Sequence, residues 1–159
     1  MGVLERLSRV FVSATTKATQ DATAGVRENY LACVERGHQL RRHAELAPQA
    51  QAAEGLAALA AAEEQQAARL REALRALGEN PPTFSGTSQP HGALNHWGRL
   101  VHDLEAHRLA ARRLRELATH FAESQPETAQ LFDTLCREEM GHCEQLRELI
   151  ARADPQALD

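Results

Sequence analysis

Two segments of the chain, within residues 50–77 and 124–151, carry apolar stripes at alternating spacings of three and four residues. The stripe positions are Leu56, Leu59, Glu63, Gln66, Leu70, Ala73 and Leu77 in the first segment, and Phe132, Leu135, Glu139, His142, Leu146 and Leu149 in the second. This spacing is typical of the buried face of an α-helix in a bundle. Apolar stripes in residues 22–46, and in a segment from His91 or Asn95 to Phe121, predict two further helices.

The connections between these helices predict their arrangement. Pro48 marks a short turn after the first helix, and Ser124-Gln-Pro-Glu127 is a capping-box pattern that predicts the start of the fourth. Residues 79–90 contain three prolines, which indicates a long loop. Short turns join antiparallel neighbours, so we predict an all-α, antiparallel four-helix bundle over residues 22–151 with one long crossover. A short amphipathic N-terminal helix is expected within residues 1–20, and a flexible tail over 152–159.

Composition agrees with a helical domain and argues against several classes of protein. The 159 residues include 29 Ala and 21 Leu but only seven Val plus Ile, which favours helix over strand. A formal net charge of −4 argues against nucleic-acid binding, and no apolar stretch of about 18 residues could form a transmembrane helix. Three cysteines do not make a disulfide framework, so the cytoplasm is the expected compartment. Because large apolar residues are few, a homodimer is expected.

Polar residues interrupt the two 3–4 stripes at matching depths. Glu63 and Gln66 interrupt the first stripe, and Glu139 and His142 interrupt the second. A buried carboxylate costs several kcal/mol unless it is paired or bound to a cation. Two carboxylates on facing helices would also repel each other, and a shared metal ion or a shared proton would relieve this repulsion. A Glu and a His three residues apart point the same way and can bind one metal ion.

These segments resemble the ferritin-like superfamily, in the rubrerythrin and bacterioferritin manner. Residues 138–142 (EEMGH) are similar to the fourth helix of that superfamily, and residues 63–67 (EEQQA) to its second helix. The resemblance covers roughly residues 22–151 and implies a ferritin-like crossover and a carboxylate-bridged centre of one or two iron or manganese ions. It also implies redox chemistry on iron, peroxide or dioxygen, as in a non-haem iron ferroxidase or peroxidase. Another protein would have to supply the electrons.

The motif is complete on only one of these two helices. The resemblance assigns Glu63 and Glu139 as bridging ligands and His142 as a ligand to one metal. Gln66 stands where the second histidine is expected, and an amide is a poor ligand for iron.

Four residues on the other two helices are candidates to complete the centre. Glu28 and Glu105 lie 35 and 34 residues before Glu63 and Glu139, which suits the family spacing. By helical phase, Glu28 points away from the apolar face of the first helix. The third helix has two apolar stripes, and Glu105 points away from the longer one but lies near the shorter one. Tyr30 and His107 point inward at about the right depth. The half of the centre with Glu139 and His142, bridged by Glu63 and completed by His107 or Glu105, is therefore better supported than the other half.

Two further hypotheses remain open at this point. In the first, the bundle has lost its metal site and serves as a dimerising interaction or structural protein. At least one of Glu63 and Glu139 would then be protonated, or paired with an arginine such as Arg108. In the second, Tyr30, His107 and His142 line a pocket for a small molecule.

Overall fold

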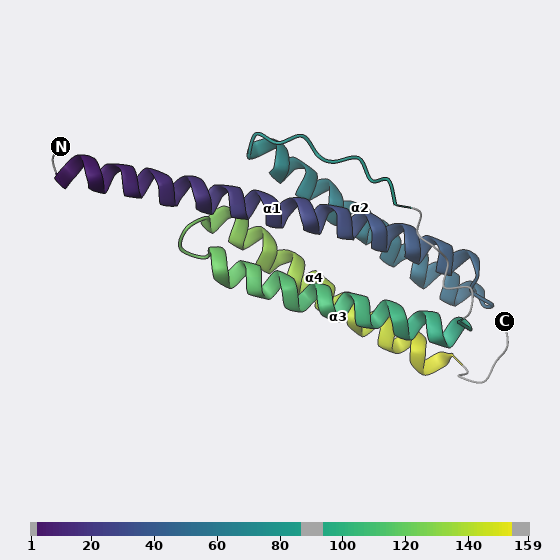
Figure 1. Ribbon diagram of the computed structural model, residues 1–159. Coiled ribbons are helices and arrows are strands. Elements are labelled where there is room, and N and C mark those ends of the chain that lie inside the picture. The colour runs from purple at the N-terminus through teal and green to yellow at the C-terminus, as the bar shows by residue number, and fades with distance from the viewer. Residues whose placement is uncertain (1–2, 87–93, 154–159) are drawn as a thin grey trace.

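Four α-helices form the described part of the chain, each with a stripe of buried residues (Figure 1). They are α1 (Val3–Glu45), α2 (Ala50–Ala76), α3 (His96–Phe121) and α4 (Pro126–Arg152). The computed structural model describes the backbone of residues 3–86 and 94–153, and the side chains of these ranges from residue 16 onward. The predicted all-α four-helix fold is confirmed. The predicted tail lies almost wholly outside the described residues.

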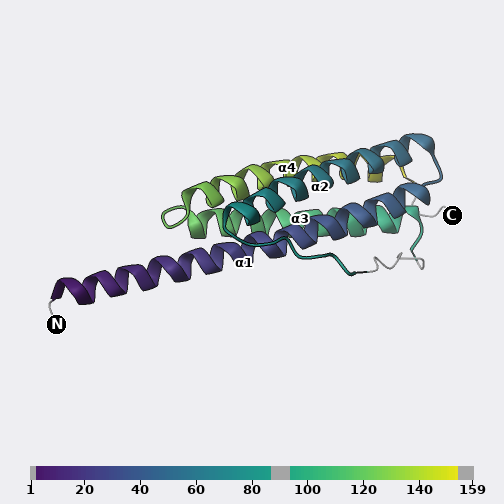
Figure 2. The same cartoon turned by 90° about the horizontal axis from the view of Figure 1, so that it is seen from above.

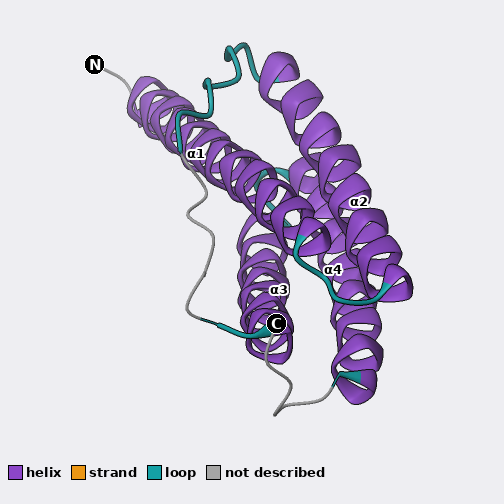
Figure 3. Ribbon diagram, turned by 90° about the vertical axis from the view of Figure 1, so that its right-hand side faces the viewer, coloured by secondary structure: helices purple, strands orange, loops and turns teal. Residues whose placement is uncertain are grey.

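The connections fix the direction of each helix. Residues 46–49 join α1 to α2, and residues 122–125 join α3 to α4, so the members of each pair are antiparallel (Figure 2). The connection from α2 to α3 starts at one end of the bundle and leads to the other (Figure 1). This is the predicted long crossover. Because α1 packs chiefly against α2, and α3 against α4, the fold consists of two helix pairs laid on one another (Figure 3).

Three helix ends show how local sequence sets the boundaries. Gly78, with φ of +82°, ends α2 in the left-handed conformation that glycine adopts without strain. Asn95 caps α3 by accepting a hydrogen bond from the Gly98 amide at 2.9 Å. The capping box predicted at Ser124 is wrong. Helix α4 begins at Pro126, after Gln125, and it has no side-chain cap. Proline suits the first helical position because it lacks the N–H that a cap would satisfy.

Helix α1 is longer than the expected first bundle helix, at 43 residues. Residues 3–20 are helical, but they continue into the bundle segment without a boundary. Neither proline nor glycine occurs between residues 3 and 24, so nothing in this stretch ends the helix. The N-terminal part of α1 extends beyond the ends of the other helices (Figures 1 and 2).

The buried apolar residues form two clusters at different levels of the bundle. One includes Val26, Leu70, Leu114, Phe121 and Phe132. The other consists of Leu40, Leu56, Leu59, Ala60, Leu100, Leu104, Cys143 and Leu146. On α2 and α3, Glu63 and His107 lie between residues of the two clusters. The polar side chains are therefore held at mid-height, with apolar packing above and below. Within the described ranges, no helix is long and apolar enough to cross a membrane.

Candidate metal centre

Four buried side chains with metal-binding donor atoms meet at the middle of the bundle. Glu63 comes from α2, His107 from α3, and Glu139 and His142 from α4. One donor atom from each residue lies within 4.8 Å of the corresponding atom in every other. Both carboxylates are 0% exposed, and the histidines are 1% and 6% exposed. The 3–4 stripes explain this convergence, because each residue occupies a position that the bundle buries.

The two histidines face the same side of the carboxylate pair. His107 Nδ1 lies 2.6 Å from Glu139 Oε2 and 3.6 Å from Glu63 Oε1. His142 Nδ1 lies 3.4 Å from Glu63 Oε1 and 3.8 Å from Glu139 Oε2. Donor atoms about 2.1 Å from one ion lie about 3 to 4 Å apart. These two carboxylate oxygens and two imidazole nitrogens could therefore hold a single ion with small adjustments.

Two of the four donor atoms lack a hydrogen bond. Glu63 Oε1 and His142 Nδ1 are buried and have no hydrogen-bond partner among the described residues. Leaving a buried polar atom unsatisfied costs about 1 to 3 kcal/mol, so such atoms are uncommon in folded proteins. The two orphaned atoms lie 3.4 Å apart, a separation at which one ion could bind both.

Arg36 of α1 occupies the opposite side of the carboxylate pair. Its Nη2 atom lies 2.9 Å from Glu63 Oε2 and 3.1 Å from Glu139 Oε1, and its Nε atom donates to Glu63 Oε2 at 3.2 Å. Each carboxylate thus presents one oxygen to the guanidinium and the other to the histidines. Nη2 also donates to Cys33 Sγ at 3.3 Å. A cation of the protein itself therefore already bridges Glu63 and Glu139.

The charges in this cluster reinforce one another. Burial alone would raise the pKa of Glu139, but the hydrogen bond with His107, the nearby His142 imidazole and the charge of Arg36 outweigh it and hold the pKa well below its usual range. Burial opposes the charged form of His142, but the Glu139 and Glu63 carboxylates raise its pKa to about 9. The same carboxylates raise the pKa of Arg36 against its burial, so it stays charged. Burial raises the pKa of the Cys33 thiol, which stays protonated.

The residues predicted from the sequence divide into two groups. Glu63, Glu139, His142 and His107 come together as described. Glu105 does not, because its side chain is 63% exposed and pairs with Arg108 on the outside of α3. The carboxylates are paired with an arginine, as the metal-free hypothesis required, but that arginine is Arg36 and not Arg108.

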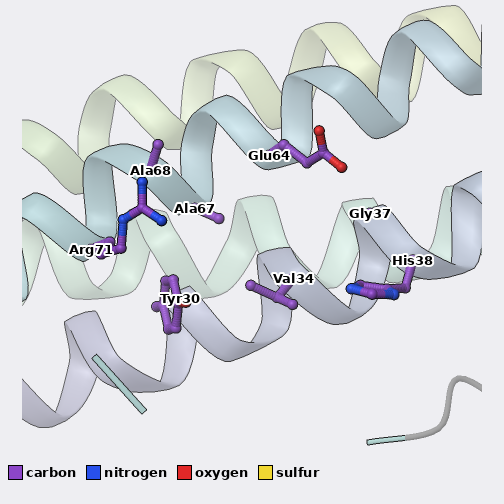
Figure 4. A pocket seen from close by; sticks show the side chains of 8 residues that line it. All are labelled: Tyr30, Val34, Gly37, His38, Glu64, Ala67, Ala68 and Arg71. Atoms are coloured by element: carbon purple, nitrogen blue, oxygen red, sulfur yellow. The ribbon is translucent and has the colours of Figure 1, made fainter. Parts of the chain in front are cut away.

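The other predicted residues lie outside the four-residue group. Glu28 is exposed and pairs with Arg113. Tyr30 lines a groove between α1 and α2 (Figure 4), together with residues that include Val34, His38, Glu64 and Arg71. This position does not fit a pocket shared by Tyr30, His107 and His142.

Gln66 is buried beside the centre but bonds elsewhere. Its amide nitrogen donates to Glu138 Oε2 at 3.2 Å, and its carbonyl oxygen accepts from Cys33 Sγ at 3.6 Å. Glu138 in turn accepts two hydrogen bonds from Arg69. Gln66 therefore links α2 to α1 and α4 at the position where the ferritin-like pattern has a histidine.

Arg36 is the residue that sequence reasoning missed, although the sequence carries a signal for it. The less polar positions of the first helix predict an apolar face that includes Tyr30, Gly37 and Ala44. A strict 3–4 stripe runs instead through Ala22, Val26, Asn29, Cys33, Arg36, Leu40 and His43, and all of these except the half-buried Arg36 are buried. Three of these positions are polar, so the stripe is not recognisable as an apolar face.

A second buried polar group lies between α1 and α3, closer to the end of α1. His43 Nδ1 lies 2.7 Å from Asp103 Oδ2, and Gln39 Nε2 donates to Asp103 Oδ1 at 2.7 Å. The same amide lies 3.0 Å from His102 Nδ1, so His102 also contacts this group. These contacts give Asp103 partners on both oxygens, which explains how its carboxylate tolerates burial.

Two helix pairs, one long crossover and inward-facing Glu and His side chains at mid-height define a ferritin-like four-helix bundle. No family model and no curated protein matches the chain. Several solved structures do match. Dps from Thermosynechococcus elongatus superposes with a TM-score of 0.79 at 16% identity, covering 91% of this chain and 99% of Dps.

Two further structures have the same fold. Bacterioferritin from Desulfovibrio desulfuricans matches with a TM-score of 0.77 at 16% identity, over 87% of this chain and 82% of that protein. The bacterioferritin-related, dodecameric thioferritin from Bacteroides fragilis matches with a TM-score of 0.70 at 16% identity, over 88% and 94%. At this level of identity the similarity establishes the fold alone, and the chemistry must be argued from the site.

Proposed function

We propose that this chain is a ferritin-like metalloprotein that holds one iron or manganese ion between Glu63, His107, Glu139 and His142. The observation that carries the proposal is the pair of orphaned atoms, Glu63 Oε1 and His142 Nδ1, which face each other across 3.4 Å in a buried space. Carboxylate oxygen and imidazole nitrogen together suit iron and manganese. A metal ion would bind both atoms, whereas without one only the protonated His142 imidazole offsets the carboxylate charge on this side.

The contacts of Arg36 favour one bound ion over two. The di-metal pattern of such bundles uses a Glu from each of two helices and Glu-x-x-His from each of the other two. Here helix α3 presents His107, α2 presents Gln66 in place of the histidine, and α1 presents a guanidinium. Arg36 takes one oxygen of each carboxylate, and those are the oxygens that a second ion would need. Its positive charge would also repel that ion.

The reaction class that fits such a centre is redox chemistry with iron, peroxide or dioxygen. An iron ion bound here would supply the one-electron steps. The chain's own residues would position the ion. Arg36 would hold the two carboxylates in place, and burial between the two apolar clusters would hold the imidazoles. The bacterioferritin neighbour is described as having a diiron site, which supports iron for this chain. The electrons would come from a separate protein.

Metal content per chain tests the proposal. Tag-free protein from cells grown with added iron and manganese is measured by elemental analysis, beside the variants His142→Ala and His120→Ala. We expect about one ion per chain in the wild type and in the His120 variant, because His120 is exposed and far along α3. His142→Ala should lose the ion. Wild-type protein that stays metal-free after reconstitution would refute the proposal.

A second candidate function rests on Arg36. The ion pairs of Arg36 with Glu63 and Glu139 already neutralise part of the carboxylate charge without metal. In that case the chain is a metal-free bundle that acts through protein partners. The triple variant Arg36→Met, Glu63→Leu, Glu139→Leu would then be as stable as the wild type or more stable, because apolar replacement of buried ion pairs is often neutral or stabilising. Loss of metal-dependent stability in this variant supports the metal centre instead.

A further inference from the structure

A groove of about 400 Å³ runs between α1 and α3 on the side of the bundle next to Arg36. Its lining includes the small residues Ala32, Ala106 and Ala110, and it is lined further by Glu28, Asn29, Glu35, Arg36, Gln39, His102, Leu109 and Arg113. The alanines leave room that larger side chains would fill. Arg36 therefore has one side against the buried carboxylates and another against this groove.

Of the residues at the centre, Arg36 lines this groove. Glu63, His107, Glu139 and His142 are not among its lining residues. The Arg36 side chain is 13% exposed. Its Nε and Nη2 atoms are used by Glu63, Glu139 and Cys33, whereas Nη1 has no hydrogen bond to a described residue. A ligand in the groove would thus meet a guanidinium with unused donors.

The charge of Arg36 determines which kind of ligand the groove would bind. A divalent ion on the histidine side, as proposed above, would take up the two negative charges of Glu63 and Glu139. Arg36 would then carry one uncompensated positive charge at the base of the groove. A cation entering the groove would be repelled by it, and one monovalent anion would be attracted.

The groove walls restrict the size of that anion. The Arg113–Glu28 ion pair joins α3 to α1 across the groove lining. Glu35, at the exposed rim, would repel large or multiply charged anions. Gln39 is held by Asp103 and His102, so it does not add a free donor. What remains is a small space lined by Arg36, whose Nη1 atom can donate to a small oxyanion.

We propose that the α1–α3 groove binds a small monovalent oxyanion, of the size of formate, on Arg36. The proposal rests on the metal centre proposed above. Anion and metal would then bind cooperatively, because the metal releases the charge of Arg36 from the carboxylates and the anion compensates it. By linkage, each ligand must increase the affinity for the other by the same factor.

Formate and Mn²⁺ binding to the full chain test this coupling. The Kd of Mn²⁺ is measured from free Mn²⁺ by electron paramagnetic resonance, in sodium formate and in sodium chloride of equal ionic strength. We expect formate to lower the Kd roughly 5-fold or more, the lower end of usual allosteric couplings. Arg36→Gln should abolish the effect of formate. Ala106→Leu, which fills the groove, should also abolish it.

Ala68→Leu is the matched control, because Ala68 is a half-buried alanine in the separate α1–α2 groove (Figure 4). It should keep the full effect of formate, and thermal unfolding checks that every variant is folded. A formate effect that survives in both Arg36→Gln and Ala106→Leu would overturn the groove site, and so would Mn²⁺ binding that formate does not change in the wild type. Absence of Mn²⁺ binding in chloride would instead refute the metal centre itself.

Discussion

Arg36 determines how this centre differs from a symmetrical di-metal site. It contacts both carboxylates at about the distance of direct ion pairs, and 13% of its side chain is exposed. A buried ion pair adds little net stability over an apolar core, but removal of one partner leaves the others uncompensated. The stability of the metal-free protein should therefore depend strongly on this one side chain.

We expect Arg36→Met to lower the free energy of unfolding of the metal-free protein by about 3 to 5 kcal/mol. The measurement is urea denaturation in the presence of EDTA. Arg113→Met is the matched control, because Arg113 pairs with Glu28 on the exposed surface and should cost less than about 1 kcal/mol. Mn²⁺ should restore much of the loss in the Arg36 variant. Equal losses in both variants would contradict a bridging role for Arg36.

His142 gives the metal-free protein a specific pH dependence. Its pKa is raised to about 9 in the folded state by Glu139 and Glu63, above the value of about 6.5 expected in the unfolded chain. The stabilisation is therefore complete below about pH 6.5 and is lost as the pH rises through about 9. We expect the free energy of unfolding in EDTA to fall by about 1 to 3 kcal/mol between these values. His142→Gln should remove most of this slope, and an unchanged slope would contradict the assigned cause.

At the scale of the helices, the position of the buried stripe on each helix decides which of its side chains reach the centre. On α2 and α4 the stripes are dominated by Leu and interrupted by Glu63, Gln66, Glu139 and His142, so most of their buried positions were predictable. The exceptions lie toward the C-terminal ends, where Ala73, Leu77 and Leu149 are only half-buried and α2 buries Leu74. Glu63 and Glu139, at matching depths on α2 and α4, lie side by side around Arg36. Tyr30 and His107 do not come together, because Tyr30 lies in the α1–α2 groove.

The α1 and α2 helices together decide how many ions the centre can hold. Gln66→His restores Glu-x-x-His on α2, but Arg36 still occupies the carboxylate oxygens that a second ion would need. We expect this single variant to bind about one ion per chain. Addition of Arg36→Glu supplies the missing α1 carboxylate and should raise the content to about two ions per chain. Elemental analysis after reconstitution measures both, and two ions in the single variant would show that Arg36 does not block the second position.

At the scale of the whole molecule, the N-terminal part of α1 is separate from the packing that holds the centre. It extends past the other helices (Figure 1), and the first fully buried residue on α1 in the described side chains is Ala22. Gln125, in the α3–α4 turn, donates a hydrogen bond to Thr19 at 3.0 Å, so contact with the second helix pair starts near this level.

Self-association is expected, and the N-terminal part of α1 is the segment in which we place it. Deletion of residues 1–15 should leave the helix content and the melting temperature of the bundle nearly unchanged and should lower the molar mass in solution. Light scattering coupled to size-exclusion chromatography measures that mass. A wild-type chain that is monomeric, or a deletion that leaves the assembly intact, would contradict this placement.

The sequence by itself determined the helices, the crossover and three of the ligands in the proposed centre. These follow from local rules: the 3–4 spacing of Leu residues on α2 and α4, the prolines of the long loop, and the cost of burying Glu63, Glu139 and His142. His107 was one of several inward candidates, and only the packed bundle distinguished it from Glu105. The place of Arg36 was decided by the tertiary structure, because its 3–4 stripe is of mixed polarity and the sequence does not show that this stripe, and not the less polar face, is buried. Its place depends on which face α1 turns to the carboxylates of the other helices, and that orientation is fixed only when all four helices pack.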